Sequence, residues 1–149
     1  MKDTDIAYIA GLFDGEGSIS ASYGVVSKVN VRVTVQIAMC DREPLDLVAS
    51  VFGGCVKELK RKTKTGKSVY QWVLNCRKAA DFLEVISPYL RIKGERARWA
   101  ISVARMTRLT GKKLPFTDDE VRCRRELVSA IKAANCRSNG RIARFADAA

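Results

Sequence analysis

The sequence predicts an α+β fold, in which four antiparallel strands form one sheet and helices cover one of its faces. The clearest strand lies at 29–38, where five β-branched residues at odd positions alternate with Asn, Arg, Thr and Gln. A second strand pair, at 55–61 and 68–76, flanks a lysine-rich turn at 62–67. Segments with helical spacing precede, separate and follow the two pairs. The predicted order is α-β-β-α-β-β-α-α-α within a single domain, 1–149.

The first half of the chain is expected to supply two helices with a hairpin between them. A helix is predicted over 6–14, and strands over 18–27 and 29–38 form the first hairpin. Residues 43–52 form the next helix, because Pro44 lies near its start and two glycines follow its end.

The second half is expected to end in three helices. Apolar residues at helical spacing predict them at 78–86, 93–109 and 117–134. The segment from about residue 135 to the end is polar and basic, and it is expected to be a mobile tail.

The residue types exclude several kinds of chemistry. The chain has five cysteines, an odd number without any C-x-x-C pair, and no histidine. A structural zinc site or a disulfide framework is therefore not expected, and the cysteines are interpreted as buried thiols in a reducing compartment. Without histidine, Ser-His-Asp and Cys-His nucleophilic systems are excluded. Any hydrolysis must use carboxylates, lysine and metal.

Charge is distributed unevenly along the chain. Residues 1–54 carry four Lys and Arg against seven Asp and Glu, a net −3, whereas residues 55–149 carry twenty-three against nine, a net +14. This imbalance favours an anionic polymer as partner over the alternative of a merely soluble basic protein. No apolar run reaches the length of a membrane span and no secretory signal is recognised, so a soluble intracellular protein is expected.

One side of the first predicted helix is almost without side chains. At about 100° per residue, Ala7, Ala10, Gly11 and Asp14 fall on one face. Glycine inside a helix costs roughly 1 kcal/mol relative to alanine, so an offsetting gain is needed. Close approach of a second helix would supply it.

A glycine-flanked carboxylate follows this helix. Gly15 and Gly17 are expected to take the positive φ angles that end a helix. Glu16 then lies at the carbonyl end, where the helix dipole disfavours negative charge, and a bound divalent cation would reverse that penalty. The alternative is an ordinary turn with a solvated glutamate.

The predicted sheet also has a polar face that the helices do not cover. Arg and Gln bond in pairs to guanine and adenine edges, and Ser, Thr and Asn adapt to bases or phosphates. Beside the lysine-rich turn, this face favours nucleic-acid binding in a major groove over a merely solvated surface. The candidate contact residues are Ser18, Ser20, Ser22, Asn30, Arg32, Thr34, Gln36, Lys57, Arg61 and Gln71.

Three segments resemble the LAGLIDADG family of homing endonucleases. Residues 9–18, IAGLFDGEGS, match the small, apolar and acidic positions of the family motif in order. Residues 88–93, PYLRIK, are similar to the family's proline-aromatic-leucine segment, which ends in a lysine near the active site. Residues 135–138, NCRS, resemble its post-helix loop, which touches DNA backbone, and add Arg137 and Ser138 to the candidate contacts.

The resemblance covers about residues 4–140 and is closest to single-motif enzymes that act as homodimers. It implies the LAGLIDADG fold with a DNA-binding saddle, and a divalent metal bound by Glu16 and the Gly15 carbonyl at the dimer axis. One motif supplies one carboxylate, so a complete site needs two chains and a long pseudo-palindromic double-stranded DNA. The residues implied to pack the first helices of two subunits together are Ala7, Ala10, Gly11 and Asp14.

The same resemblance assigns roles to two cations. Lys93 is the candidate that neutralises charge on the phosphate or the water network during cleavage. Arg42, close to Met39 where a relative typically carries glutamine, is the candidate basic member of that water network. Hard oxygen ligands suit Mg²⁺, with Mn²⁺ as a substitute and Ca²⁺ expected to bind without supporting cleavage. No small-molecule cofactor and no membrane partner are expected.

The leading hypothesis is a homodimeric, Mg²⁺-dependent, site-specific double-strand DNA endonuclease, either encoded in an intron or free-standing. The alternative is a non-cleaving nucleic-acid-binding protein on the same scaffold, either an RNA maturase or a DNA-binding regulator. A third possibility, a basic protein-interaction domain, would leave the polar sheet face without a purpose.

Overall fold

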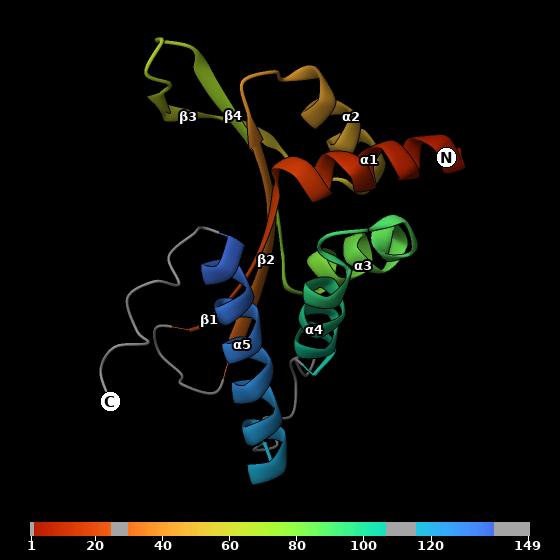
Figure 1. Cartoon of the computed structure of the whole chain (residues 1–149), viewed down its shortest axis with the longest axis vertical. Helices are drawn as coiled ribbons and strands as arrows, with labels where there is room; N and C mark the ends of the chain where they lie inside the picture. Colours follow the sequence, from red (N-terminus) through yellow and green to blue (C-terminus); the bar gives the residue numbers. More distant parts are fainter. Residues whose placement is uncertain (1, 25–29, 107–115, 139–149) are drawn as a thin grey trace.

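Two β-hairpins form one four-stranded antiparallel sheet, and helices pack on one face of it, as predicted (Figure 1). The computed structural model describes residues 2–24, 30–106 and 116–138. The α+β fold class is therefore confirmed. The elements are α1 (Asp3–Glu16), β1 (Gly17–Tyr23), β2 (Val31–Met39), α2 (Glu43–Phe52), β3 (Val56–Lys62), β4 (Ser68–Asn75), α3 (Cys76–Ile86), the 3₁₀ turn η1 (Ser87–Tyr89), α4 (Gly94–Arg105) and α5 (Asp118–Ser138).

The strand order is β1-β2-β4-β3, so the two hairpins join through their second strands. Across this junction Thr34 pairs with Asn75, and Ile37 pairs with Trp72. Odd-numbered residues of β2 from Val31 to Ile37 are buried under the helices, whereas the even-numbered ones lie on the other face. The alternation seen in the sequence thus sets which face of the sheet is apolar.

The end of α1 differs from the expectation. The helix continues through Glu16 and passes directly into β1, and Gly17 has an extended backbone with φ −76°. The expectation of positive φ angles at Gly15 and Gly17 is therefore wrong, because only Gly53, Gly54 and Gly66 have them among the described glycines. Gly17 is needed for space instead, since a Cβ there would lie 2.5 Å from the Phe13 carbonyl oxygen.

The last helix is longer than predicted. Helix α5 extends to Ser138, so residues 135–138 form its final turn rather than the start of a tail or a post-helix loop. This segment is polar, but the side chain of Asn135 finds hydrogen-bond partners on two other elements, which favours its continued helical packing.

The core is organised around Phe82 on α3. Its ring makes edge-to-face contacts with Phe13, Phe52 and Trp72, at centroid distances of 5.1, 4.9 and 5.0 Å respectively. These partners belong to α1, α2 and β4, so one ring connects three elements to α3. The indole N–H of Trp72 donates to the Gly53 carbonyl at 2.8 Å, which fixes the turn after α2.

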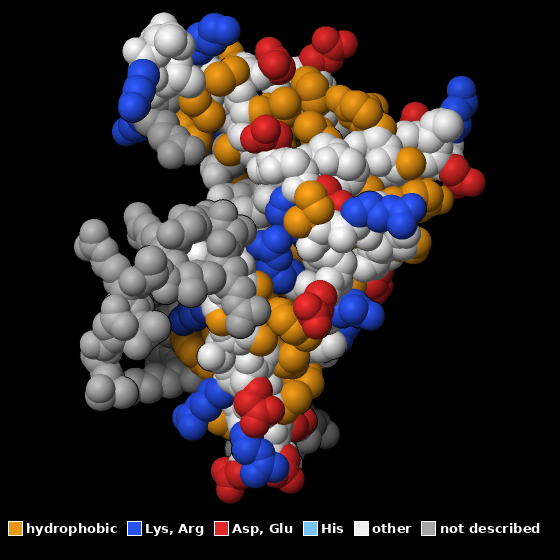
Figure 2. Space-filling model, viewed as in Figure 1, with side chains coloured by type: hydrophobic (Ala, Val, Ile, Leu, Met, Phe, Trp, Pro, Cys, Tyr) orange, Lys and Arg blue, Asp and Glu red, His pale blue; other side chains and the backbone are white. Residues whose placement is uncertain are grey.

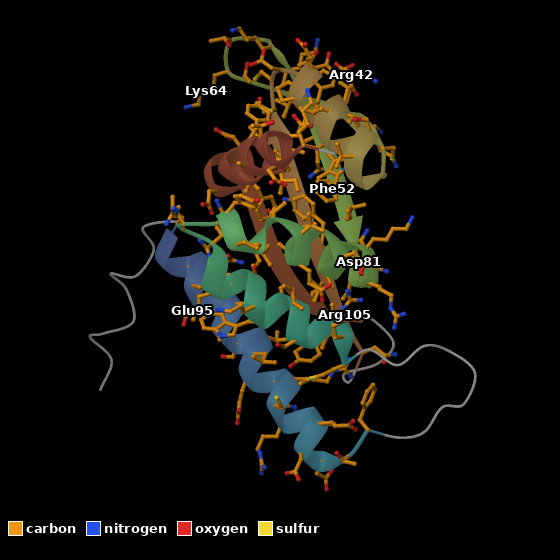
Figure 3. All side chains as sticks on the ribbon, turned by 90° about the vertical axis from the view of Figure 1, so that its right-hand side faces the viewer. Arg42, Phe52, Lys64, Asp81, Glu95 and Arg105 are labelled. Carbon is orange, nitrogen blue, oxygen red and sulfur yellow. The ribbon has the colours of Figure 1, made fainter. Side chains whose placement is uncertain are left out.

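Exposed ion pairs link α3 and α4 on the outer side of the helical layer. Arg105 on α4 pairs with Asp81 and Glu84 on α3, and Figure 3 shows Asp81 and Arg105 facing each other there. These groups are exposed, so the pairs contribute little to stability.

None of the described helices has the length and apolar character needed to cross a membrane.

The cysteines are more exposed than expected. All five are free thiols, but three are exposed and two half-buried, so their interpretation as buried thiols is wrong. Cys40 and Cys55 lie between elements rather than on core-facing positions, which explains their exposure.

Truncation at the centre of the aromatic cluster tests this description of the core. Phe82→Ala is expected to lower the free energy of unfolding by ~3–5 kcal/mol, because three ring contacts are lost and a cavity remains. Urea unfolding measures the effect. Val85→Ala is the control, because Val85 lies on the same helix but is 37% exposed. Equal losses for the two variants would contradict the central role of Phe82.

Candidate functional site

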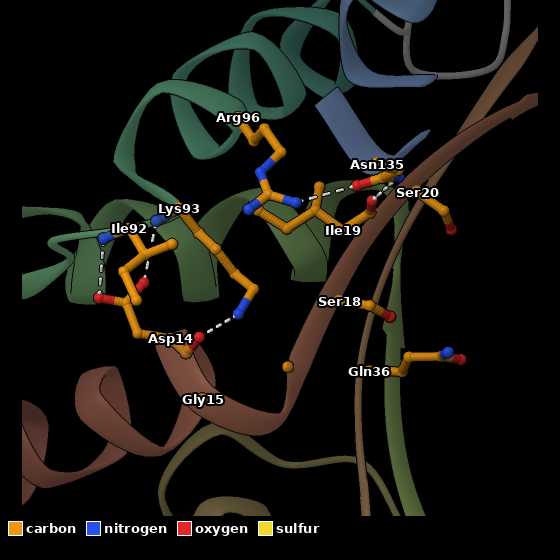
Figure 4. A pocket seen from close by; sticks show the side chains of 11 residues that line it. Asp14, Gly15, Ser18, Ile19, Ser20, Gln36, Ile92, Lys93, Arg96 and Asn135 are labelled. Atoms are coloured by element: carbon orange, nitrogen blue, oxygen red, sulfur yellow. Dashed lines mark hydrogen bonds between the residues drawn. The ribbon is translucent and has the colours of Figure 1, made fainter. Parts of the chain in front are cut away.

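A pocket of about 500 Å³ opens where the end of α1, the start of α4, the end of α5 and the uncovered face of the sheet meet. Figure 4 shows Lys93 and Arg96 reaching toward it from the α4 side, opposite Ser18 and Gln36 on the strands. The residues that line it are Asp14, Gly15, Gly17, Ser18, Ile19, Ser20, Gln36, Ile92, Lys93, Arg96 and Asn135.

The carboxylate of Asp14 binds the loop that precedes α4. The backbone N–H groups of Arg91, Ile92 and Lys93 donate to it at 2.6, 3.1 and 3.0 Å respectively. A carboxylate at the start of α4 also complements the positive end of that helix's dipole. Asp14 thus ties the end of α1 to the start of α4.

The side chain of Lys93, at the start of α4, connects back to the end of α1. Its side chain is buried, at 7% exposure, and its Nζ donates to the Asp14 backbone carbonyl. Carbonyls in the last turn of a helix have no partner within the helix, and α1 has no basic residue of its own there. The ammonium of Lys93 therefore supplies both the missing donor and a charge that suits the helix dipole.

The two groups have perturbed proton affinities. Burial raises the pKa of the Asp14 carboxyl, but the three backbone hydrogen bonds and the Lys93 charge together outweigh it, so this pKa lies below its usual value. Burial lowers the pKa of the Lys93 ammonium, and the charge of Arg96 lowers it further. Asp14 and Glu16 act in the opposite direction on Lys93 but do not cancel the shift.

Glu16 and the Gly15 carbonyl lie at the tip of α1, beside this pocket. Glu16 is exposed, and its charge reaches Lys93. The described part of the chain contains no cluster of three or more Asp, Glu, Cys or His that could hold a metal ion. Since the Asp14 carboxylate is already engaged, one chain offers a hard cation the Glu16 carboxylate and the Gly15 carbonyl. This donor set fits half of a shared metal site.

The sequence did not reveal that Arg96 and Asn135, which both line the pocket, contact each other. Arg96 Nη1 donates to Asn135 Oδ1 at 3.1 Å, and Asn135 Nδ2 donates to the Ile19 carbonyl at 2.8 Å (Figure 4). The spacing of Lys93 and Arg96, three residues apart at the start of a helix, could have indicated a shared face. The contact with Asn135 spans 39 residues and leaves no local signal.

The structure does not bring Arg42 to the pocket. Its Nε pairs with Asp46 at 3.1 Å, and its guanidinium lies 5.9 Å from the centre of the Tyr70 ring. Figure 3 places Arg42 at the end of the molecule far from Glu95, which is in the first turn of α4. Met39 packs against the core and does not line the pocket. The single chain therefore gives no geometric support to a role for Arg42 in active-site water ordering.

The small face of α1 is only partly available to a second chain. Ala10 is fully buried in the core of its own chain, and Asp14 is committed to the loop before α4, so neither can serve as expected in a helix pair. Ala7 and Gly11 are exposed, and a Cβ on Gly11 would meet no described atom within 4 Å outside the backbone of α1. The helix is rotated so that one edge of the predicted face points inward.

The polar sheet face is present where it was expected. Two hydrogen bonds order it, from Thr34 to Asn75 at 2.8 Å and from Gln71 to Gln36 at 2.9 Å. Asn75 was not among the predicted contacts, although it alternates with Gln71 on the same face of the strand predicted at 68–76. Of the predicted contact residues, the exposed ones are Ser20, Ser22, Asn30, Arg32 and Lys57, and the half-buried ones are Ser18, Thr34, Gln36 and Gln71. The side chains of Arg61, Arg137 and Ser138 lie outside the described part of the structure.

Positive charge gathers at the pocket. Figure 2 shows Lys and Arg side chains between the tip of α1 and α4. Among the described residues that line the pocket, Asp14 is the only carboxylate. This charge suits the binding of phosphate groups beside Lys93 and Arg96.

Comparison with family models finds a match to the LAGLIDADG-like domain over residues 3–87, which is more than half of the chain. Comparison with curated protein sequences found no significant match.

Solved structures share the fold. The homing endonuclease I-CvuI, in complex with the I-CreI target and Mg, has 22% identity and a TM-score of 0.54, covering 84% of this chain and 95% of that one. The archaeal intron-encoded homing endonuclease I-Vdi141I, complexed with DNA, has 15% identity and a TM-score of 0.58, covering 91% and 99%. I-SmaMI, bound to an uncleaved DNA target with calcium, has 18% identity and a TM-score of 0.63, covering 87% of this chain but 45% of that one.

The Asp14 contacts predict a pH-dependent contribution to stability. Because the folded-state pKa is depressed, the contribution is full above an unfolded pKa of about 4 and is lost as pH falls through the lower folded value. Asp14→Asn should lower the free energy of unfolding by ~1–3 kcal/mol at neutral pH, since one amide oxygen cannot accept three N–H groups.

Urea unfolding of both proteins between pH 7 and pH 3 checks this prediction. The difference between wild type and Asp14→Asn should shrink toward the acid end. Asp41→Asn, a change to an exposed carboxylate for which no such contacts are seen, is the control. A difference that stays constant with pH would contradict the assignment.

Proposed function

The chain belongs to the LAGLIDADG-like domain family, and on that premise we propose that it is a metal-dependent, site-specific endonuclease of double-stranded DNA that acts as a homodimer. The observation that carries the proposal is the pocket beside Glu16, where Lys93 and Arg96 face a space large enough for a phosphate group. A gene that lies within an intron, or one that is free-standing, would suit such an enzyme.

The Glu16 carboxylates and Gly15 carbonyls of two chains would hold the metal. Mg²⁺ is the proposed ion, with Mn²⁺ as a substitute and Ca²⁺ supporting binding only, because all the donors are hard oxygens. When bound, the metal supplies an activated water and stabilises the leaving oxygen of the phosphodiester.

Lys93 contributes charge to the phosphate. Its Nζ is held at the Asp14 carbonyl, so the ammonium is fixed before substrate arrives. A phosphate brought into the pocket would raise the lowered pKa of Lys93 and so keep it charged. The lysine thus neutralises negative charge that builds up on the phosphate during cleavage.

The polar sheet face would bind the DNA. The exposed Arg32 and Lys57 extend it beyond the pocket on opposite hairpins, and a major groove admits a two-stranded β-ribbon such as either hairpin. Because side chains from both hairpins contribute, this face suits a duplex better than a single small ligand. Cleavage distinguishes the proposal from a non-cleaving regulator or an RNA maturase.

The proposed dimer would form through the exposed side of α1. Ala7 and Gly11 allow close approach, and the neighbouring Tyr8 and Leu47 are 50% and 39% exposed although both are large and apolar. I-SmaMI, of which this chain covers 45%, has the length of two such units, which supports a functional unit of two copies.

The catalytic assignment predicts a separation of binding from cutting. Glu16→Gln should retain affinity for duplex DNA within about threefold and lose cleavage, because the exposed amide keeps the fold but is a poor Mg²⁺ ligand. The substrate is the duplex that wild type recovers from a randomised library in Mg²⁺, and product ends are sequenced.

Asp3→Asn is the control for that test, because Asp3 is an exposed carboxylate at the other end of α1. Cutting by Glu16→Gln at the wild-type rate would refute the role of Glu16. Recovery of a bound duplex without new ends from wild type would instead favour the non-cleaving alternative.

The interface assignment predicts a monomeric variant. Gly11→Leu should leave the chain folded, since outside the backbone of α1 itself no described atom lies within 4 Å of a Cβ at that position, and it should halve the mass seen by sedimentation. Ala133→Leu, at an exposed position on α5, is the matched control. An unchanged dimer with Gly11→Leu would exclude this face as the interface.

A further inference from the structure

Arg96 is half-buried and lines the pocket beside Lys93. In the described part of the pocket lining, the only carboxylate is that of Asp14, which accepts three backbone N–H groups. Arg96 and Lys93 therefore face one another as like charges, and the charge of Arg96 lowers the pKa of Lys93. Asp14 and Glu16 offset this repulsion only in part, and phosphates bound beside the two cations would offset it further.

Asn135 orients the guanidinium without neutralising it. The Ile19 carbonyl can only accept, so Asn135 must turn its NH₂ toward β1 and its oxygen toward Arg96. An aspartate at this position would cancel the charge of Arg96, whereas the amide preserves it. Within the described residues, one of the five N–H donors of the guanidinium is used, and a planar edge is left for another acceptor.

The side chains of Lys93 and Arg96 are anchored to different parts of the segment that runs from the end of α1 into β1. Lys93 is tied to Asp14 in the last turn of α1, whereas Arg96 is tied through Asn135 to Ile19, the third residue of β1. Since a strand rises roughly 3.3 Å per residue, Arg96 lies farther from the tip of α1 than Lys93 does. The cations are thus placed to bind different phosphates.

We propose that Arg96 binds a backbone phosphate of the substrate DNA adjacent to the one that is cut, and that Asn135 is the positioning residue that holds its guanidinium. This inference rests on the proposed function. Arg recognises phosphate through paired N–H donors in a fixed plane, so the contact depends on orientation as well as charge. A preset guanidinium would fix the register of the DNA backbone against Glu16.

A methylphosphonate scan tests the proposal. Single phosphates of the duplex selected by wild type are neutralised one at a time, and affinity is measured in Ca²⁺. In wild type, neutralising the phosphate bound by Arg96 should weaken binding by about tenfold. In Arg96→Gln, the same substitution should have less than about a twofold effect, while losses at other phosphates persist.

Arg98→Gln is the matched control, because Arg98 is an exposed arginine on the same helix and lines a different surface hollow. Its scan should retain the loss at the phosphate assigned to Arg96. A scan of Arg96→Gln identical to that of wild type would overturn the proposal, as would a uniform reduction at every position. If the wild-type protein binds no duplex, the proposed function is overturned as well. This failure is detected before any variant is tested, so it is distinguished from failure of the Arg96 proposal alone.

Two further variants separate orientation from charge. Asn135→Ala keeps the charge of Arg96 but removes its anchor, so the loss at the same phosphate should fall to about threefold. Arg96→Lys keeps a charge that cannot pair in a planar fashion, and it should restore only part of the wild-type loss. A scan of Asn135→Ala that equals wild type would show that Asn135 does not position Arg96.

Discussion

The end of α1 and the start of α4 cap each other through Asp14 and Lys93, and the rest of the site depends on these reciprocal hydrogen bonds. The carboxylate at the end of α1 accepts the N–H groups at the start of α4, and the ammonium at the start of α4 donates to a carbonyl at the end of α1. Each charge complements the dipole of the other helix. The contact therefore fixes Lys93 relative to the tip of α1, where Gly15 and Glu16 lie.

The continuation of α1 through Glu16 separates the two carboxylates of its last turn, Asp14 and Glu16. Residues two apart on a helix point about 200° apart, so the side chains of Asp14 and Glu16 leave α1 on nearly opposite sides. Asp14 turns toward the loop before α4 and is used within the chain, while Glu16 is exposed. An earlier end of the helix at Gly15 would have removed this separation. Helical geometry thus leaves Glu16 as the exposed carboxylate at the tip of α1.

The sequence predicted local features better than distant contacts. Proline and glycine signals gave the bounds of α2 correctly, and alternation identified the buried face of β2. The order in which the hairpins join, the burial of Ala10 and the hydrogen bond from Arg96 to Asn135 depend on packing between distant segments. Gly17 was correctly marked as special but for the wrong reason, because its need is space beside Phe13 and not a positive φ.

Several unfavourable features of the single chain would be relieved by the proposed assembly. Glu16 places negative charge at the carbonyl end of a helix, and Tyr8 and Leu47 expose apolar surface on the neighbouring side. Lys93 and Arg96 hold like charges around one pocket. A second copy would cover the apolar surface, a cation would offset the glutamates, and the phosphates of bound DNA would offset the two cations. The costs retained in the isolated chain are thus those that its proposed partners remove, which argues that they are maintained for binding rather than for stability.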